Sequence, residues 1–374
     1  MKQSASISIV FSLMLAGTSF ATASNWESTT TLAAEAKPDN CEPVGRIANI
    51  EGLGLLKREA WNEFYPTVKG TKLCLGDRIK AAPGAKIIIQ CTDPNQPPWT
   101  VSNGETQGAA KGCPKPETPR YGIDGPTVPM RTETARRIPY IISPPETARL
   151  NDKPKLRWIA VEGATSYNVR VSGSGVDWKT DVSTTQVVYS GQQPLKPSVN
   201  YLLTVNADNG EKADETVFFL LDEKKAQPLR DAAFAIAKQN LPDEAKALAL
   251  ADLYIEREFL IPDAIDLLEP LAAKGSQTAP VYHTLGNLYA VVGLFSQAEK
   301  YYSKAVELAT TAKDIEGQAA AAVRLGEVYN ALGNSDSAIA WFKKAQNGYQ
   351  QLGDMQRVRK LEQQQSEIEK TRMP

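Results

Sequence analysis

The sequence predicts a multidomain protein: an all-β N-terminal half made of two β domains, followed by an all-α solenoid of helical repeats. Three observations support this fold class. Up to about residue 222, short apolar runs are broken by Gly, Asp, Asn and Pro, which is the pattern of antiparallel strands. After Lys225, apolar residues recur at i, i+3, i+4 and i+7, which is typical of helices. Finally, the stretch 285–309 is written a second time at 325–349.

Length and composition set limits on the class of protein. The 374 residues suggest two or three domains, and 42% hydrophobic with 23% charged residues is ordinary for a soluble globular protein. The formal net charge of −1 creates no global attraction toward nucleic acid or an anionic membrane. We therefore expect no nucleic-acid partner.

Residues 1–23 have the order of a secretory signal peptide. Lys2 precedes an apolar stretch at 7–16, and small residues follow at 21–23. The alternative is a membrane anchor, but the apolar stretch is well short of the roughly 20 residues that span a bilayer. We expect an exported protein, periplasmic or secreted, with a polar flexible leader at 24–40 and no later transmembrane segment.

The first β domain, 41–113, holds all four cysteines of the chain. In an exported protein, Cys41, Cys74, Cys91 and Cys113 are expected to form two disulfides. The alternative is a zinc site, but there is no CxxC pair and the sole histidine, His283, is far away in the sequence. Three pairings are possible, and loop closure favours Cys91–Cys113 with Cys41–Cys74. We expect no metal and no cofactor.

The middle of this β domain has a further pattern: a Gly before a strand, a Leu-x-x-Gly-Asp turn, and an Ala-rich step into a second strand. The residues are Gly70, Leu73, Gly76, Asp77, Ala85 and Ile87 to Ile89. The pattern resembles the FecR-type extracytoplasmic domain. The resemblance implies a periplasmic signalling or binding fold without catalysis, although this chain lacks the transmembrane helix of the sensor members.

Residues 114–140 are rich in Pro and are expected to form an extended linker. Strand patterns resume at 141–222, spaced as in a β-sandwich. Leu195, Pro197 and Tyr201 form a Leu-x-Pro-x-x-x-Tyr motif that resembles the tyrosine corner of fibronectin type III and immunoglobulin-like domains. In that setting Trp158 is a core residue, and the alternative is a platform on which a ligand stacks.

Small and aromatic residues recur in the repeated stretch with the same spacing. The first copy has Leu285, Gly286, Tyr289, Ala298, Tyr302 and Ala305; the second has Leu325, Gly326, Tyr329, Ala338, Phe342 and Ala345. This spacing resembles that of tetratricopeptide repeats. The resemblance implies pairs of antiparallel helices over 226–374, with a degenerate upstream copy, flanking helices at 226–239 and 357–370, and longer second helices that absorb the extra length of the period.

The resemblance also implies a concave face, built from first helices, that binds a protein or peptide partner. The residues expected to line it are His283, Asn287, Arg324, Glu327 and Asn330. Asn287 and Arg324 stand where members that bind charged chain termini place their contacts, but the accompanying lysines are absent. Each of the five residues has a second interpretation, as an ordinary solvated side chain.

No motif in the sequence indicates a reaction. There is no nucleophile elbow, phosphate loop, HExxH or calcium loop. Paired carboxylates, as in an envelope-carbohydrate enzyme, are a distant alternative. We therefore expect a non-enzymatic scaffold or adaptor, and the main alternative is an extracytoplasmic sensor or regulator that uses the FecR-like domain as its binding module. The sequence leaves the oligomeric state open.

Overall fold

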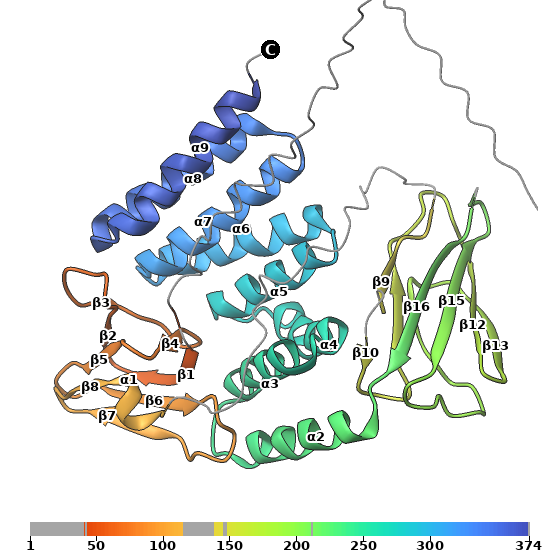
Figure 1. The fold of residues 1–374 in the computed structure, drawn as a ribbon, viewed down its shortest axis with the longest axis horizontal. Coiled ribbons are helices and arrows are strands. Elements are labelled where there is room, and N and C mark those ends of the chain that lie inside the picture. The colour runs from red at the N-terminus through yellow and green to blue at the C-terminus, as the bar shows by residue number, and fades with distance from the viewer. Residues whose placement is uncertain (1–40, 42, 115–137, 145–147, 211, 373–374) are drawn as a thin grey trace, which may run out of the picture. The chain divides into compact units, whose positions relative to one another are not determined.

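The computed structural model describes residues 41, 43–114, 138–144, 148–210 and 212–372 (Figure 1). The predicted signal peptide, the leader and most of the predicted linker lie outside these residues. Within them, strand-rich segments occupy the N-terminal half and a series of helices occupies the C-terminal half. The fold class predicted from the sequence is therefore confirmed.

The first strand-rich segment, residues 43–113, is called the N-terminal module below. Its two four-stranded sheets, ordered β4-β1-β6-β7 and β3-β2-β5-β8, share one apolar core. Alternation along the strands builds this core, since Ile87 and Ile89 of β6 are both fully buried on the same face. The strands are β1 Pro43–Glu51, β2 Gly54–Lys57, β3 Tyr65–Pro66, β4 Lys72–Cys74, β5 Arg78–Ala81, β6 Lys86–Cys91, β7 Trp99–Ser102 and β8 Thr106–Gly108.

Two disulfides and a short helix complete the N-terminal module. The disulfides are Cys41–Cys74 and Cys91–Cys113, the pairing that loop closure favours. Helix α1, Ala109–Gly112, ends next to Cys113. The sequence did not predict α1, because four residues are too few to display a helical period.

The second strand-rich segment, residues 141–220, is called the sandwich. A five-stranded sheet, β10-β16-β15-β12-β13, and a three-stranded sheet, β14-β11-β9, enclose one core. Trp158 is 2% exposed in that core, which confirms its interpretation as a core residue. The hydroxyl of buried Tyr201 accepts a hydrogen bond of 2.8 Å from the backbone N–H of Lys196. The strands are β9 Ile141–Ser143, β10 Ala148–Arg149, β11 Lys155–Trp158, β12 Tyr167–Gly173, β13 Val176–Val182, β14 Gln186–Val188, β15 Asn200–Ala207 and β16 Asp214–Leu220.

Helices fill the remainder of the described chain and are together called the array. Helix α2 begins at Glu223, earlier than the predicted residue 226, because the Asp222 side chain caps it by accepting a hydrogen bond of 2.7 Å from the N–H of Lys224. The helices are α2 Glu223–Lys238, α3 Asp243–Glu258, α4 Ile261–Ala273, α5 Ala279–Val291, α6 Phe295–Thr311, α7 Ile315–Ala331, α8 Ser335–Leu352 and α9 Met355–Arg372.

Helices α3/α4, α5/α6 and α7/α8 are successive packed pairs, in each of which the first-named helix is the first helix of a repeat. The extra length of the period has two parts. Helix α6 continues past Ala305 to Thr311, as predicted. Helix α7 begins further before its Leu325 than α5 begins before its Leu285. In the part of the chain that the structure describes, no helix is both long enough and apolar enough to cross a bilayer.

Candidate functional site

The site is built on the close approach of α5 to α6 and of α7 to α8. A Cβ added to Gly286 would lie 2.5 Å from the ring of Tyr302, and one added to Gly326 would lie 2.5 Å from the ring of Phe342. Ala298 of α6 is fully buried at the same crossing. Small residues therefore allow the helix pairs to pack closely, and this packing fixes which side chains α5 and α7 present on their first-helix face.

Four of the five predicted partner-binding residues gather around one aromatic side chain that the sequence analysis treated only as packing. The hydroxyl of Tyr302 donates a hydrogen bond of 2.7 Å to Oδ1 of Asn287. The ring of His283 meets the ring of Tyr302 edge-on, with centroids 5.7 Å apart. Arg324 donates a hydrogen bond of 2.8 Å to Glu327, and both charges act on Tyr302. These five residues are called the Tyr302 cluster.

The two rings of the cluster, those of Tyr302 and His283, are electrically neutral. Burial raises the pKa of the Tyr302 phenol far above its usual value, while Arg324 lowers it in part. Burial, together with the positive charges of Arg324, Lys72 and Arg46, lowers the pKa of His283 to about 3. The Tyr302 phenol is therefore a hydrogen-bond donor and the imidazole is uncharged at any physiological pH.

Asn330, the fifth predicted residue, lies apart from the others. It is exposed near the end of α7, one turn beyond Glu327. The side chains of Arg324 and Glu327 are each more than a third exposed, and Asn287 is half-buried. The accessible part of the first-helix face therefore runs from Asn287 toward the C-terminal end of α7.

The N-terminal module contacts the other end of this face. The second residues of three first helices touch it: Glu244 of α3 pairs with Lys69 at 2.9 Å, Pro280 of α5 meets Gly70, and Glu316 of α7 pairs with Arg58. Each first helix thus begins against the module. No local pattern of the sequence predicts this arrangement, because the partners lie so far apart along the chain.

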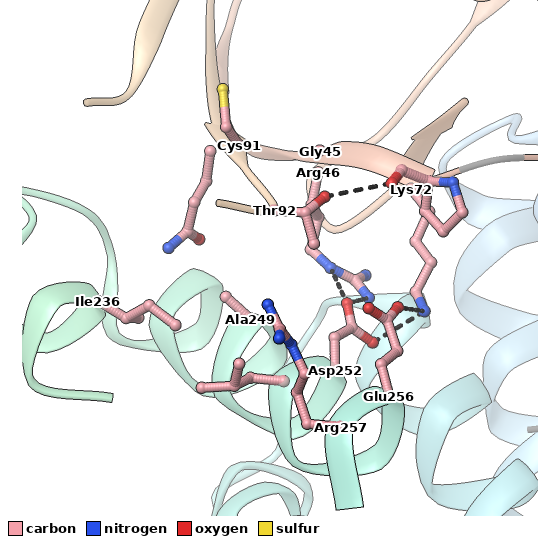
Figure 2. A pocket seen from close by; sticks show the side chains of 13 residues that line it. Gly45, Arg46, Lys72, Cys91, Thr92, Ile236, Ala249, Asp252, Glu256 and Arg257 are labelled. Carbon is pink, nitrogen blue, oxygen red and sulfur yellow. Dashed lines mark hydrogen bonds and ion pairs between the residues drawn. The ribbon is translucent and has the colours of Figure 1, made fainter. Parts of the chain in front are cut away.

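Asp252 is the most buried charged contact of this kind, and Figure 2 shows its neighbours. Its Oδ2 accepts a hydrogen bond of 3.1 Å from Nε of Arg46, and its Oδ1 lies 2.9 Å from Nζ of Lys72. Glu256, one turn further along α3, lies 3.7 Å from the same Nζ. Burial by itself would raise the pKa of Asp252, but Arg46 and Lys72 outweigh it and hold this pKa below its usual value.

A pocket lies beside these ion pairs, between α3 and the strands β1 and β6. Ile236 and Ala249 form part of an apolar wall, and Arg257 extends into the pocket from α3 (Figure 2). Arg257 makes no ion pair in the part of the chain that the structure describes. The pocket has a volume of about 30 Å³ and is also lined by the carboxylates of Asp252 and Glu256, so it has room for one or two water molecules and not for an organic ligand.

A second buried ion-pair group marks where α7 meets the module. Arg58 pairs with Glu316 of α7 and, at 2.8 Å, with Asp77. Burial raises the pKa of Asp77 to about 6, although Arg58 and the backbone N–H of Cys74 act in the opposite direction. Asp77 belongs to the Gly-Asp turn of the FecR-like pattern, and here it orients the arginine that reaches α7.

Neither ion-pair group has the geometry of a metal centre. Among the described residues, no three His, Cys, Asp or Glu side chains are grouped so that they could hold a metal ion. The cysteines of the module are consumed in disulfides.

Comparison with known proteins identifies the repeat. Residues 277–351, which span α5 to α8, match the family model of the tetratricopeptide repeat. Proteins built from this repeat typically bind other proteins and are not enzymes. The array therefore contains tetratricopeptide repeats, as the spacing of the repeated stretch indicated. No curated protein matches the chain.

Several solved structures are similar to part of the chain. A crystal structure of BtubC (BKLC) from P. vanneervenii is 18% identical, with 40% of this chain and 73% of that chain covered and a TM-score of 0.29. A crystal structure of MamA is 22% identical, covers 40% of this chain and 93% of that chain, and has a TM-score of 0.28. A crystal structure of nearly identical TPR-like repeats from a Podosopora anserina putative kinesin light chain is 20% identical, covers 40% and 89%, and has a TM-score of 0.27.

Proposed function

We propose that this protein is an exported, non-enzymatic scaffold that binds a protein partner on the first-helix face of its tetratricopeptide repeats. The observation that carries the proposal is the Tyr302 cluster. It holds ordered donors and acceptors on α5 and α7, within the segment that matches the repeat family. A repeat protein presents such first helices as an extended binding surface.

The partner contacts are assigned to His283, Asn287, Arg324, Glu327 and Asn330. The accessible members favour an extended peptide with mixed polarity, because Arg324 and Glu327 offer one charge of each sign and Asn330 offers an amide. Hydrogen bonds to such charged groups are stronger than those between neutral groups. Asn287 is held by Tyr302, which leaves its amide nitrogen oriented for a partner's carbonyl group.

Export is part of the proposal. The signal-peptide pattern at 1–23 and the presence of two disulfides both favour an oxidising compartment, periplasmic or extracellular. Within this reading, residues 41–113 are a FecR-like domain and 141–222 a fibronectin type III or immunoglobulin-like domain. The hydrogen bond of the Tyr201 hydroxyl supports the second assignment, since tyrosine corners bind nearby backbone in this way.

Affinity capture from the exported fraction, followed by binding measurements with the recovered partner, tests the proposal. Arg324→Ala and Asn287→Ala should each weaken binding about tenfold, the loss of one or two hydrogen bonds to charged or polar groups. Lys343→Ala is the matched control, since Lys343 is exposed on the second helix α8. Equal affinities for all three variants and the parent would refute the assignment of this face.

A sensor or regulator is the second candidate function. The observation that favours it is a cavity of about 560 Å³ lined by Asp93 to Asn95 of the N-terminal module and by residues of α2 and α3, including Arg257, because a ligand there would touch both parts at once. Under this alternative, Arg257→Gln would abolish the response to a small anionic ligand while leaving capture of the protein partner unchanged. Loss of partner capture in Arg324→Ala alone would favour the scaffold.

A further inference from the structure

Strand β13 of the sandwich has an unpaired edge. It ends the five-stranded sheet β10-β16-β15-β12-β13, and among the described residues no strand pairs with its outer side (Figure 1). The array pairs with the opposite edge of this sheet, where Arg149 of β10 lies 2.9 Å from Asp266 of α4. The outer side of β13 is therefore not used in that contact and is open to a further strand.

The turn before β13 fixes which of its residues have outward backbone groups. Gly173 and Val176 flank a two-residue turn, in which Ser174 has φ +46° and Gly175 has φ +86°. In such a type I′ hairpin the flanking residues form a hydrogen-bonded pair, and hydrogen-bonded pairs then alternate with non-hydrogen-bonded pairs along the strands. The even-numbered residues of β13 therefore bond to β12. The odd-numbered residues, whose N–H and C=O groups point to the open side, are Asp177, Lys179 and Asp181.

The charges of these three residues are balanced unequally. Asp177 accepts a hydrogen bond of 2.7 Å from Nε of Arg170, whereas Nζ of Lys179 lies 3.8 Å from the same carboxylate. Asp181 accepts a hydrogen bond of 2.8 Å from the amide of Asn168 and has no ion pair among the described residues. Since Arg170 already neutralises Asp177, the edge retains one cation and one anion on the same face, two residues apart.

A second copy of β13 can pair with the first so that these charges meet. In an antiparallel pair centred on Thr180, Lys179 of each copy lies opposite Asp181 of the other, which gives two attractive cross-strand pairs. Both residues have outward backbone groups, so these are also hydrogen-bonded pairs. The same register places Trp178 opposite Val182 twice, and both side chains are only partly buried at the sandwich core.

Neighbouring registers are less favourable. A pair centred on Lys179 would place that lysine opposite its own copy and Asp177 opposite Asp181, so like charges would repel. A pair centred on Trp178 would place Lys179 opposite Asp177, which Arg170 already neutralises, and would run into the preceding turn. Charged residues on an edge strand usually deter pairing, and here they favour one register over its neighbours.

We propose that the β13 edge binds a second copy of this chain, in an antiparallel pair centred on Thr180. The two five-stranded sheets then form one continuous sheet across a twofold axis. This pairing goes beyond the proposed function and does not depend on it. A dimer of this kind presents two first-helix faces, which increases avidity toward a partner that carries repeated binding segments.

Charge exchange in the full-length chain tests the pairing. Sedimentation equilibrium between micromolar and millimolar concentration should show a monomer–dimer equilibrium for the parent. Lys179→Glu should weaken the dimer about tenfold or more, because both attractive pairs become repulsive. Adding Asp181→Lys should restore it, because the two charges are then exchanged. Lys343→Glu makes the same charge change on the exposed surface of α8 and should dimerise like the parent.

Two results of this experiment would overturn the proposal. A parent that stays monomeric throughout the concentration range would leave the edge to a strand of another protein. A dimer that Lys179→Glu does not weaken would show that the two copies meet on another surface.

A single introduced thiol tests the register, since all four native cysteines form disulfides. Centred on Thr180, the two Thr180 residues form a non-hydrogen-bonded pair with Cα atoms about 4.5 Å apart, within reach of a disulfide. Thr180→Cys should therefore give a disulfide-linked dimer on mild oxidation, detected by non-reducing electrophoresis.

Asp177→Cys is the matched control on the same strand. In this register Asp177 lies opposite Ser183 of the other copy, so the two introduced thiols would be about 20 Å apart along the strands and should not crosslink. Circular dichroism of both variants verifies that the fold is retained. Failure of Thr180→Cys to crosslink, or equal crosslinking of both variants, would contradict the pairing.

Discussion

Asp252 shows how one carboxylate joins distant parts of the sequence. Its partner Arg46 is only 5% exposed, and the two residues lie 206 positions apart. A buried pair of this kind gains little over a well-packed apolar pair, but removing one member leaves the other charge uncompensated. The stability of the contact between the N-terminal module and α3 should therefore depend on Asp252 being ionised.

Asp252→Asn should lower the free energy of unfolding by about 3–5 kcal/mol at pH 7, because Arg46 then stays buried without its counter-charge. Since the pKa of Asp252 is lowered below its usual 3.8, its contribution is present above pH 3.8 and is lost as the pH falls through the folded-state value. Urea unfolding at pH 7 and pH 3 should show the gap between parent and variant closing at the lower pH.

The control for this measurement is Glu307→Gln, which removes the exposed ion pair with Lys304. Such surface pairs contribute little, so the variant should unfold like the parent at both pH values. If Asp252→Asn also unfolds like the parent at pH 7, the buried ion pair does not stabilise the fold.

Gly286 carries the helix crossing that positions the Tyr302 cluster. Gly286→Ala places a Cβ 2.5 Å from the ring of Tyr302, so either the ring or α5 must shift. We expect the free energy of unfolding to fall by about 1–3 kcal/mol. Circular dichroism during a urea titration measures this loss. Gly108→Ala is the control, since an added Cβ there lies 3.9 Å from its nearest neighbour. Equal stability of the two variants would show that α5 and α6 do not pack closely at Gly286.

At the scale of elements, α4 joins the array to the sandwich through ion pairs. Asp266 of α4 lies 2.9 Å from Arg149 and 3.8 Å from Arg157, and both arginines are buried at the sandwich surface. Glu269, one turn along α4, also pairs with Arg157 and accepts a hydrogen bond from Tyr289 of α5. One face of α4 therefore ties the sandwich to the first helix of the next repeat.

Asp266→Asn should reduce the free energy of unfolding by about 1–3 kcal/mol, the typical value of hydrogen bonds to charged groups. The loss is expected because two buried arginines then share the remaining carboxylates. Asp177→Asn in β13 is the control: it breaks an exposed pair with Arg170 and should change nothing measurable. Urea unfolding compares the two variants. The same midpoint for both would show that the ion pairs between α4 and the sandwich do not stabilise the fold.

At the scale of the whole molecule, local patterns predicted the elements and missed the contacts between them. The strands, the cysteine pairing and the positions of Gly286 and Tyr302 follow from spacing along the chain, because each depends on neighbours a few residues or one repeat away. The contacts of Arg46, Lys72 and Gly70 with α3 and α5 depend on packing across most of the sequence. No period or motif encodes such contacts, so the sequence placed His283 on the first-helix face without indicating that its Nε2 is buried.

Site-specific photocrosslinking in the full-length chain distinguishes partner binding on the first helices from binding elsewhere on the array. Benzoylphenylalanine placed at Asn330, at the accessible end of the first-helix face, should crosslink to the captured partner. The same group placed at Lys343, exposed on the second helix α8, should not. A crosslink from Lys343 with none from Asn330 would contradict partner binding on the first helices.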